Sequence, residues 1–170
     1  LKGVVGRHLF VDLALFNIRT RDELIPFEIP NSGGRRYFRN AGETLRRGAE
    51  LGLTAALGMF DLGGTLTRLA YTYEDYRVGT TRLDGKEVPG VSPVTSSLFA
   101  TARHRVGFAT VEMQQASRTA ADDANANYAP GWVLWNARVG LPTRNRWGVS
   151  PVIGIDNLFD RPYAANIVTN

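Results

Sequence analysis

Hydrophobic and polar residues alternate along the segment LRRGAELGLTAALGM, residues 45–59. Most odd-numbered positions carry leucine or alanine, with Arg47 as the exception, whereas the even-numbered positions carry polar, charged or very small residues. Because successive side chains of a strand point to opposite faces, this pattern predicts a strand with one apolar face and one thin polar face. The pattern starts again in TLTRLAYTYEDYRV, after a short turn predicted at Phe60–Gly64.

The same alternation predicts seven strands along the chain. Several are much longer than the usual 5–6 residues of globular strands, and the second is also longer than the ~9–11 residues that cross a bilayer. We expect Gly42 to mark a bulge or bend within that second strand. The predicted ranges are Val4–Thr20, Arg36–Met59, Thr65–Val78, Val94–Arg103, Val106–Arg118, Trp132–Leu141 and Trp147–Phe159.

Long and short connections alternate between these strands. Long polar loops are predicted at Asp22–Arg36, Gly79–Gly90 and Thr119–Gly131, and short turns near Asp61, His104 and Thr143. In a meander this order puts all the long loops at one end, which is typical of an outer-membrane barrel, whereas a soluble sandwich usually has short turns at both ends. We therefore predict an all-β fold, an antiparallel up-and-down meander of about seven strands within a larger transmembrane β-barrel.

The shared parity of the strands predicts which side chains face lipid and which face the lumen. The alternative reading of the same pattern is a soluble β-sandwich binding module, whose apolar face is buried in its core. In the barrel, the lipid-facing set includes Leu51, Leu53, Leu57, Val111, Val139 and Ile153, and the lumen-facing set includes Glu50, Thr54, Glu112, Arg138 and Asp156.

Composition narrows the class of protein. The chain has 170 residues, which suits one segment of ordinary domain size, and no apolar run approaches the ~20 residues of a transmembrane helix. That absence excludes a helical membrane protein but not a barrel, whose strands alternate. The net charge is +4, but the arginines are scattered along the chain, so we expect no nucleic-acid partner.

The residues do not form a pattern that indicates catalysis. The two histidines, His8 and His104, lack a second ligand at zinc spacing, and the chain has no cysteine and no G-x-S-x-G motif. Asp122 and Asp123 fit a solvated loop better than a calcium site, which needs six to eight oxygen ligands. We predict a protein that is not an enzyme and that has no catalytic residue, no metal site and no cofactor.

Three stretches resemble TonB-dependent outer-membrane receptors. The segment Gly154–Asn170 is similar to the penultimate strand of that family, and its residues Asn157, Leu158, Phe159, Asp160 and Tyr163 match the N-L-F-D-x-x-Y motif. The segment ALFNIRTRDELIPFE resembles a strand-loop element of the family. The stretch RNAGETLRRGAELGL resembles a further strand of the family, matched at Asn40, Ala41, Gly42, Gly48, Glu50 and Leu51. These matches occur in order over nearly the whole chain, and siderophore receptors are the subgroup it resembles most.

The resemblance implies a barrel of about 22 strands with a plugged lumen, in the outer membrane of a Gram-negative bacterium. It implies a receptor that takes up a scarce nutrient, most simply a ferric siderophore, and is energised by the TonB complex through the plug. The expected partners are the plug domain, the rest of the barrel, the TonB complex, and outer-membrane lipid and lipopolysaccharide. Residues 1–170 lack the plug, the first two-thirds of the barrel and the final strand. The alternative within membrane proteins is a passive porin-like or autotransporter barrel.

Candidate ligand contacts follow from the predicted orientation. The last strand of the family descends to the periplasm, so the seventh strand here is expected to rise and the long loops to lie outside. Arg35, Arg36 and Tyr37 then stand where the first long loop returns to the barrel, and Arg77 and Arg82 flank the second. Arginine and tyrosine suit an anionic ferric complex with flat aromatic or carbonyl faces. The alternative is that these arginines bind lipopolysaccharide phosphates or only solvate the loop, and the sequence leaves the identity of the siderophore open.

Overall fold

A computed structural model describes residues 1–28, 36–40, 42–142 and 148–164. These residues form strands, turns and irregular segments. Among them there is no helix that is long and apolar enough to cross a membrane.

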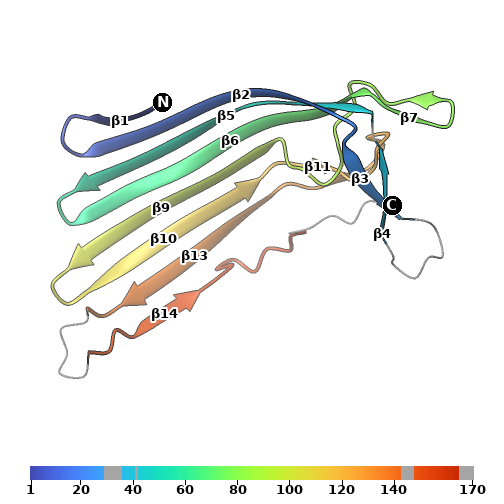
Figure 1. The fold of residues 1–170 in the computed structure, drawn as a ribbon. Helices are drawn as coiled ribbons and strands as arrows, with labels where there is room; N and C mark the ends of the chain where they lie inside the picture. Colours follow the sequence, from blue (N-terminus) through green and yellow to red (C-terminus); the bar gives the residue numbers. More distant parts are fainter. Residues whose placement is uncertain (29–35, 41, 143–147, 165–170) are drawn as a thin grey trace.

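One antiparallel sheet of eight strands forms the body of the structure (Figure 1). Each strand pairs with the next one in the order β1-β2-β5-β6-β9-β10-β13-β14, so the predicted up-and-down meander is confirmed. The strand bounds are β1 Lys2–Val5, β2 Leu9–Arg21, β5 Glu43–Leu57, β6 Phe60–Asp75, β9 Val94–His104, β10 Gly107–Ala116, β13 Trp132–Gly140 and β14 Val152–Ile155.

The three long connections contain short hairpins. Strand β3 (Leu24–Glu28) pairs with β4 (Arg36–Asn40), β7 (Arg77–Val78) with β8 (Thr81–Arg82), and β11 (Thr119–Ala120) with β12 (Tyr128–Ala129). Figure 1 shows these hairpins at one end of the sheet, opposite the end at which consecutive long strands are joined by turns. The predicted gathering of the long loops at one end is therefore confirmed.

The sheet has eight strands, not the predicted seven, because the predicted strand Val4–Thr20 divides into β1 and β2. Gly6 has a φ of 66°, and the chain reverses there so that Val5 pairs with Leu9. The positive φ is a conformation that glycine adopts without steric cost. The apolar pattern continues on both sides of the turn, so alternation alone did not mark it.

The turn predicted at Phe60–Gly64 is wrong. The chain turns at Gly58 and Met59, with Gly58 at a φ of 65°, and Phe60 already pairs with Leu57. Gly63 and Gly64 are therefore interior residues of β6. A Cβ added at Gly63 would lie 2.7 Å from ring atoms of Phe99, and one at Gly64 would collide with the side chain of Leu98.

The predicted strands at Arg36–Met59 and Trp147–Phe159 are both too long. The first divides into β4 and β5 at Gly42, where a bend was expected and where φ is 70°. The second is described as a strand only over β14, and its first residue, Trp147, lies outside the described residues. The N-L-F-D motif forms a turn and not a strand, because Asn157 and Asp160 have φ values of 53° and 47°.

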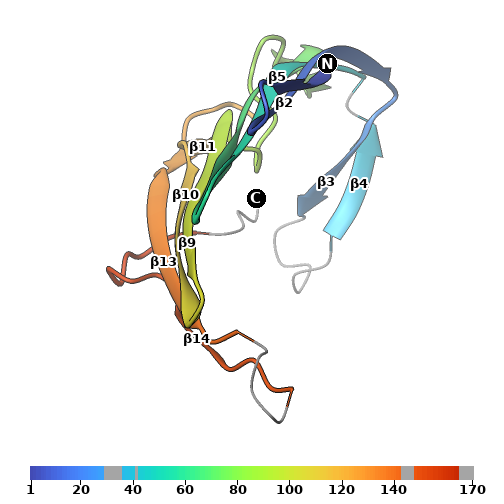
Figure 2. The ribbon, with the colours of Figure 1, turned by 90° about the vertical axis from the view of Figure 1, so that its left-hand side faces the viewer.

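The sheet is curved, and the β3–β4 hairpin lies on its concave side (Figure 2). Glu23, directly before β3, contacts Arg46 of β5, so the even-numbered face of β5 is the concave one. The pairing of residues between neighbouring strands then shows on which face of the sheet the predicted lipid-facing and lumen-facing residues lie. The apolar set shares the convex face and the polar set the concave face.

Three phenylalanines on the concave face each lie opposite a glycine of the neighbouring strand. The pairs are Phe16 with Gly48, Phe99 with Gly63, and Phe108 with Gly140. In each pair a Cβ on the glycine would clash with the phenylalanine ring, so the ring lies across the space that a side chain would fill. This arrangement explains how large apolar residues fit on an otherwise polar face.

Candidate ligand-binding surface

Glu23, Arg46 and Tyr71 meet on the concave face at the loop end of the sheet. The guanidinium of Arg46 donates to Glu23 and, at 2.8 Å, to the hydroxyl oxygen of Tyr71. Its central carbon also lies 4.3 Å from the centre of the Tyr71 ring. Thr44 donates a hydrogen bond to the other carboxylate oxygen of Glu23. Because Glu23 precedes β3, this cluster anchors the base of the β3–β4 hairpin to β5 and β6.

A small apolar core supports this cluster from the neighbouring loop. Tyr73, Tyr76, Leu83 and Val88 are buried together, and Tyr71 packs against them. The rings of Tyr73 and Tyr76 lie 4.5 Å apart between centres. The segment after β8 reaches this position because the N–H of Val88 donates to the Tyr71 carbonyl at 2.9 Å, which places it beside the upper end of β6.

The loop between β10 and β13 is joined to the same core. The hydroxyl of the fully buried Tyr73 donates to Asp123 at 2.7 Å, and the N–H of Gly90 donates to the Ala120 carbonyl at 3.0 Å. The amide side chain of Asn125 both accepts from the N–H of Glu87 and donates to its carbonyl. Two of the three long loops therefore form one connected structure above the sheet.

Asp122 organises the turn within the β11–β12 loop. The N–H of Ala126 donates to its Oδ1 at 2.9 Å, and the N–H and side-chain amide of Asn127 donate to its Oδ2. The hydrogen bond from Ala126 is the main reason that the pKa of Asp122 lies below its ordinary value, and it acts against a smaller effect of burial. Asp122 has a structural role here and does not form part of a described metal cluster.

Of the predicted contact residues, Arg77 and Arg82 face each other in the β7–β8 hairpin. Both are exposed, and Arg82 pairs with Asp84. The carboxylate of Asp84 is partly desolvated, but the N–H of Tyr76 and the arginine side chains outweigh that effect and lower its pKa. The hairpin therefore presents Arg77 as an exposed cation beside an ion pair.

The remaining predicted residues belong to the first long loop. Arg35 lies outside the described residues, and Arg36 is described by its backbone, opposite Glu28 in the β3–β4 hairpin. Tyr37 pairs with Phe27 and is 39% exposed. Figure 1 shows the β3–β4 and β7–β8 hairpins projecting separately from the sheet, so Tyr37 lies on a different hairpin from Arg77 and Arg82.

Charged side chains continue down the concave face toward the turn end. Arg138 of β13 contacts Glu112 of β10 at 3.2 Å and Asp156, the residue directly after β14, at 3.3 Å. Farther along the sheet, Lys2 pairs with Asp12 at 3.0 Å at the rim of a polar hollow that also includes Glu50. These ion pairs make the concave face suitable for contact with water or with a polar protein surface.

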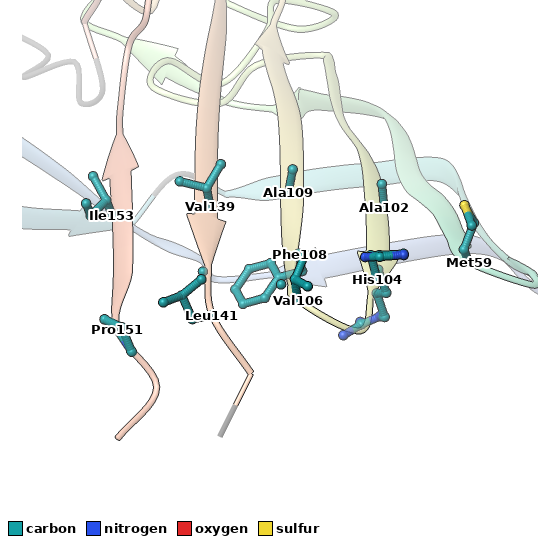
Figure 3. Close-up of a pocket in the computed structure, with 13 residues that line it drawn as sticks. Met59, Ala102, His104, Val106, Phe108, Ala109, Val139, Leu141, Pro151 and Ile153 are labelled. Carbon is teal, nitrogen blue, oxygen red and sulfur yellow. The ribbon is translucent and has the colours of Figure 1, made fainter. Parts of the chain in front are cut away.

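An apolar hollow of about 600 Å³ lies at the turn end of the sheet (Figure 3). Its walls include Met59, Phe108, Val139 and Ile153, and among the described residues that line it only His104 and Arg103 carry titratable side chains. A single histidine among apolar side chains does not provide the paired acid and base of a hydrolytic site. The hollow is part of the apolar surface and does not compete with the loop end as a ligand site.

Sequence reasoning missed the Glu23–Arg46–Tyr71 cluster. The alternation placed Arg46 on the polar face of its strand but did not assign Tyr71 to that face, so their contact as direct neighbours in the β5–β6 register was not predicted. The contact with Glu23 was not predicted either, because Glu23 lies in a segment expected to be a loop and reaches Arg46 across 23 residues. The described residues contain no group of three His, Cys, Asp or Glu side chains placed to hold a metal ion.

The comparison with protein families agrees with this architecture. The family model described as TonB dependent receptor-like, beta-barrel matches residues 2–158. That range includes all eight strands of the main sheet and the three hairpins.

Solved receptor structures share the fold. The siderophore receptor PiuA from Acinetobacter baumannii is 19% identical with a TM-score of 0.71, over 98% of this chain and 25% of that one. The ferric yersiniabactin uptake receptor FyuA from Yersinia pestis is 16% identical with a TM-score of 0.70, over 92% of this chain and 23% of that one. The copper transporter OprC is 17% identical with a TM-score of 0.72, over 94% of this chain and 24% of that one. The chain thus spans about a quarter of the length of these proteins.

Proposed function

Because the chain belongs to the TonB-dependent receptor β-barrel family, we propose that it forms part of the wall of an outer-membrane receptor that imports a ferric siderophore. The family and its solved relatives are receptors and transporters and not enzymes. The observation that carries the ligand proposal is the Arg46–Tyr71 surface beneath two arginine-bearing hairpins, all at the loop end of the sheet.

The two faces of the sheet support placement in a membrane. The convex face carries exposed apolar residues such as Leu53, Val111 and Ile153, which suit the lipid side of a barrel. The concave face carries the ion pairs of Arg138 and the polar hollow around Glu50, which suit a lumen occupied by a plug domain. In this arrangement the loop end lies outside the cell and the turn end in the periplasm.

Energy for uptake comes, in this proposal, from the TonB complex acting on the plug. The chain itself supplies a fixed wall, because its long strands pair continuously along the sheet. The concave charges then act as the surface against which the plug moves or reorders. A passive porin-like or autotransporter barrel, the alternative, needs no plug and no TonB complex.

The ligand chemistry follows from the groups at the loop end. An anionic complex is attracted by exposed Arg77 and by the arginines of the β3–β4 hairpin, and a planar chelating group can stack on tyrosine. The side chain of Arg46 already lies against Tyr71, so this pair offers a cation and an aromatic face together. The similarity to a copper transporter makes copper complexes the comparison ligands for any test.

The test uses the complete receptor from which this chain comes. Three variants would be compared: Arg35→Ala with Arg36→Ala and Tyr37→Ala, Arg77→Ala with Arg82→Ala, and Arg46→Ala with Tyr71→Phe. Equilibrium binding of a panel of ferric siderophores and of copper salts, together with uptake by whole cells, gives the readout. We expect weaker binding of one ferric complex in at least one variant, with normal surface expression.

Three outcomes contradict the proposal. Unchanged affinity for the bound ferric complex in all three variants removes these residues from the ligand site. Uptake that persists in cells without a functional TonB complex favours the passive barrel. Binding of copper but of no ferric complex assigns the receptor to another cargo. A control is Lys2→Ala, which pairs with Asp12 in the β1–β2 hairpin and not in the hairpins at the loop end.

A further inference from the structure

The convex face has a layered charge distribution near the loop end. The zone toward the turn end is apolar, with Leu51, Leu53 and Leu66 in adjoining strands. In the zone nearest the loop end, Arg19 and Arg21 pair with Glu43 and Glu74, so two cations balance two carboxylates. Between these zones lies a third one, which carries positive charge without acidic partners.

Arg47 and Arg68 form this middle zone. Arg68 lies opposite Ala49, and Arg47 lies opposite Ala70 of the same strand pair, so the two arginines are diagonal neighbours on the convex face. Diagonal neighbours in a sheet are about 7–8 Å apart, a separation that long side chains span. Both arginines are exposed. Two guanidinium groups can therefore reach one common anion.

These two cations have no acidic partner within the part of the chain that the structure describes. Arg47 donates from Nε to the side-chain oxygen of Asn17 at 3.3 Å, which is a neutral partner. Arg68 makes no hydrogen bond or ion pair with any described residue. Two like charges side by side without a counter-ion repel each other, so an external anion bound between them is favoured.

An apolar hollow of about 550 Å³ begins directly below the pair. Its lining includes Gly64 and Ser96 together with Leu53, Leu66, Leu98 and Met113 of the neighbouring strands. Leu66 lines the hollow and precedes Arg68 by two residues on the same face of β6. Two residues along a strand span roughly 7 Å, so the hollow and the cations are adjacent.

We propose that Arg47 and Arg68 bind the phosphate of a phosphorylated, acylated membrane lipid, with an acyl chain lying in the hollow at Gly64. The inference rests on the membrane placement proposed above. The arginines supply charge and bidentate hydrogen bonds to phosphate, and the hollow supplies apolar contact for the chain. Lipopolysaccharide of the outer leaflet belongs to this class of lipid.

The position of the pair along the strands is consistent with a lipid headgroup. Charged residues on the lipid face of a barrel cost about 2–4 kcal/mol at the bilayer midplane but only ~0–1 kcal/mol near its surface. An unpaired arginine pair at the upper margin of the apolar zone is therefore tolerated where phosphates are available. The zone nearest the loop end does not need an external anion, because its arginines are paired with carboxylates, as in the contact of Arg21 with Glu43 at 2.9 Å.

The experiment measures lipid binding to the complete receptor in an uncharged detergent, by native mass spectrometry. The probes are a diphosphorylated lipid A, the same lipid without its phosphates, and the phosphorylated disaccharide without acyl chains. The variant is Arg47→Ala with Arg68→Ala. The matched control is Arg19→Ala with Arg21→Ala, which removes the same charge from the zone nearest the loop end.

We expect the Arg47/Arg68 variant to lower the affinity for phosphorylated lipid about tenfold, while the control pair changes it little. Replacement of both arginines by lysine should retain part of the affinity, because charge remains but the bidentate geometry is lost. Unchanged lipid affinity in the Arg47/Arg68 variant overturns the inference. So does an equal loss in the control pair, or equal binding of the disaccharide without acyl chains.

Two further readouts separate this inference from the proposed function. Heat-modifiable migration on gels reports whether each variant is a folded barrel, and ferric-siderophore binding reports whether the ligand site is intact. A receptor that is absent from the outer membrane contradicts the proposed function. A receptor that is folded, inserted and able to bind its ligand, but whose lipid affinity is unaffected by the substitutions, contradicts the lipid site alone.

Discussion

The side-chain amide of Asn125 pairs with the backbone of Glu87 in the way a neighbouring strand would. Its oxygen accepts from the Glu87 N–H at 2.7 Å, and its nitrogen donates to the Glu87 carbonyl at 2.9 Å. The two residues are 38 positions apart in the sequence. One side chain therefore joins the segment after β8 to the loop between β11 and β12.

Replacing Asn125 by alanine should release the two loops from each other. An unsatisfied buried N–H or carbonyl costs about 1–3 kcal/mol, so the local opening of the Glu87 segment should become easier by that order. Hydrogen exchange at the Glu87 amide in the complete receptor measures the effect.

The glycine variant at position 125 is the control, because Asn125 has a φ of 55°. Alanine is strained in that conformation, whereas glycine is not. Faster exchange in both variants assigns the effect to the lost hydrogen bonds. Normal exchange at Glu87 in the glycine variant would contradict the role given to the amide.

Arginine should be tolerated at Thr54 and disfavoured at Leu53, although the two residues are adjacent. Leu53 faces the convex side and Thr54 the concave side. In the complete barrel, Leu53→Arg should lower the free energy of unfolding by about 2–4 kcal/mol if it lies near the midplane. Thr54→Arg should cost much less, because the concave face is polar. Equilibrium unfolding of the receptor in lipid vesicles tests the difference, and equal costs would refute the assignment of faces.

Acid should destabilise the β11–β12 loop through Asp122. Its pKa is lowered in the folded loop, chiefly by the hydrogen bond from the Ala126 N–H. A carboxyl group with a lowered folded pKa stabilises the fold fully above its ordinary value of about 3.9. That contribution is lost as the pH falls below this value through the folded pKa.

Protection of the Ala126 and Asn127 amides from hydrogen exchange, measured relative to the intrinsic exchange rate at each pH, should therefore fall below about pH 4 in the intact receptor. The variant Asp122→Asn should show lower protection at neutral pH and little further loss of protection in acid. If the asparagine variant has the same acid dependence as the parent, another group is responsible for it.

Residues 1–170 alone should fail to form a stable monomer in water. In the described part of the chain, β1 and β14 are the edge strands of the main sheet, and free strand edges favour association with further strands. Ile153 is 72% exposed and Leu15 75% exposed, on a convex face that carries many other apolar residues. Analytical ultracentrifugation without detergent should show aggregates, whereas a monodisperse monomer that melts cooperatively would argue against a membrane role.

Much of the fold follows from the alternation of side chains. A period of two assigns faces without knowledge of partners, so the sets containing Leu53 and Glu112 were placed correctly. Turns were harder to predict. Gly58-Met59 lacks the asparagine-glycine signature of a tight hairpin, whereas Asp61 and Gly63-Gly64 have turn composition but lie within β6. Those glycines are explained by the neighbouring strand, which local sequence does not reveal.

The candidate site was less accessible to sequence reasoning. Arg46 was assigned to a polar-face position, but its contacts with Tyr71 and Glu23 were not predicted, and the contact with Glu23 depends on how the β3–β4 hairpin folds back over the sheet. The predicted group that contains Tyr37, Arg77 and Arg82 was chosen by position at the ends of loops. The structure divides its described members between two hairpins, and their role in ligand binding stays a prediction.

The glycine–phenylalanine pairs of the concave face affect how wide the lumen is beside this part of the barrel wall. Phe16, Phe99 and Phe108 lie across Gly48, Gly63 and Gly140, so each ring fills space next to the wall of the neighbouring strand. A larger residue in place of any of these glycines would push the ring inward toward the axis of the closed barrel. In the proposed barrel, these small residues therefore set how much space remains between this part of the wall and whatever occupies the lumen.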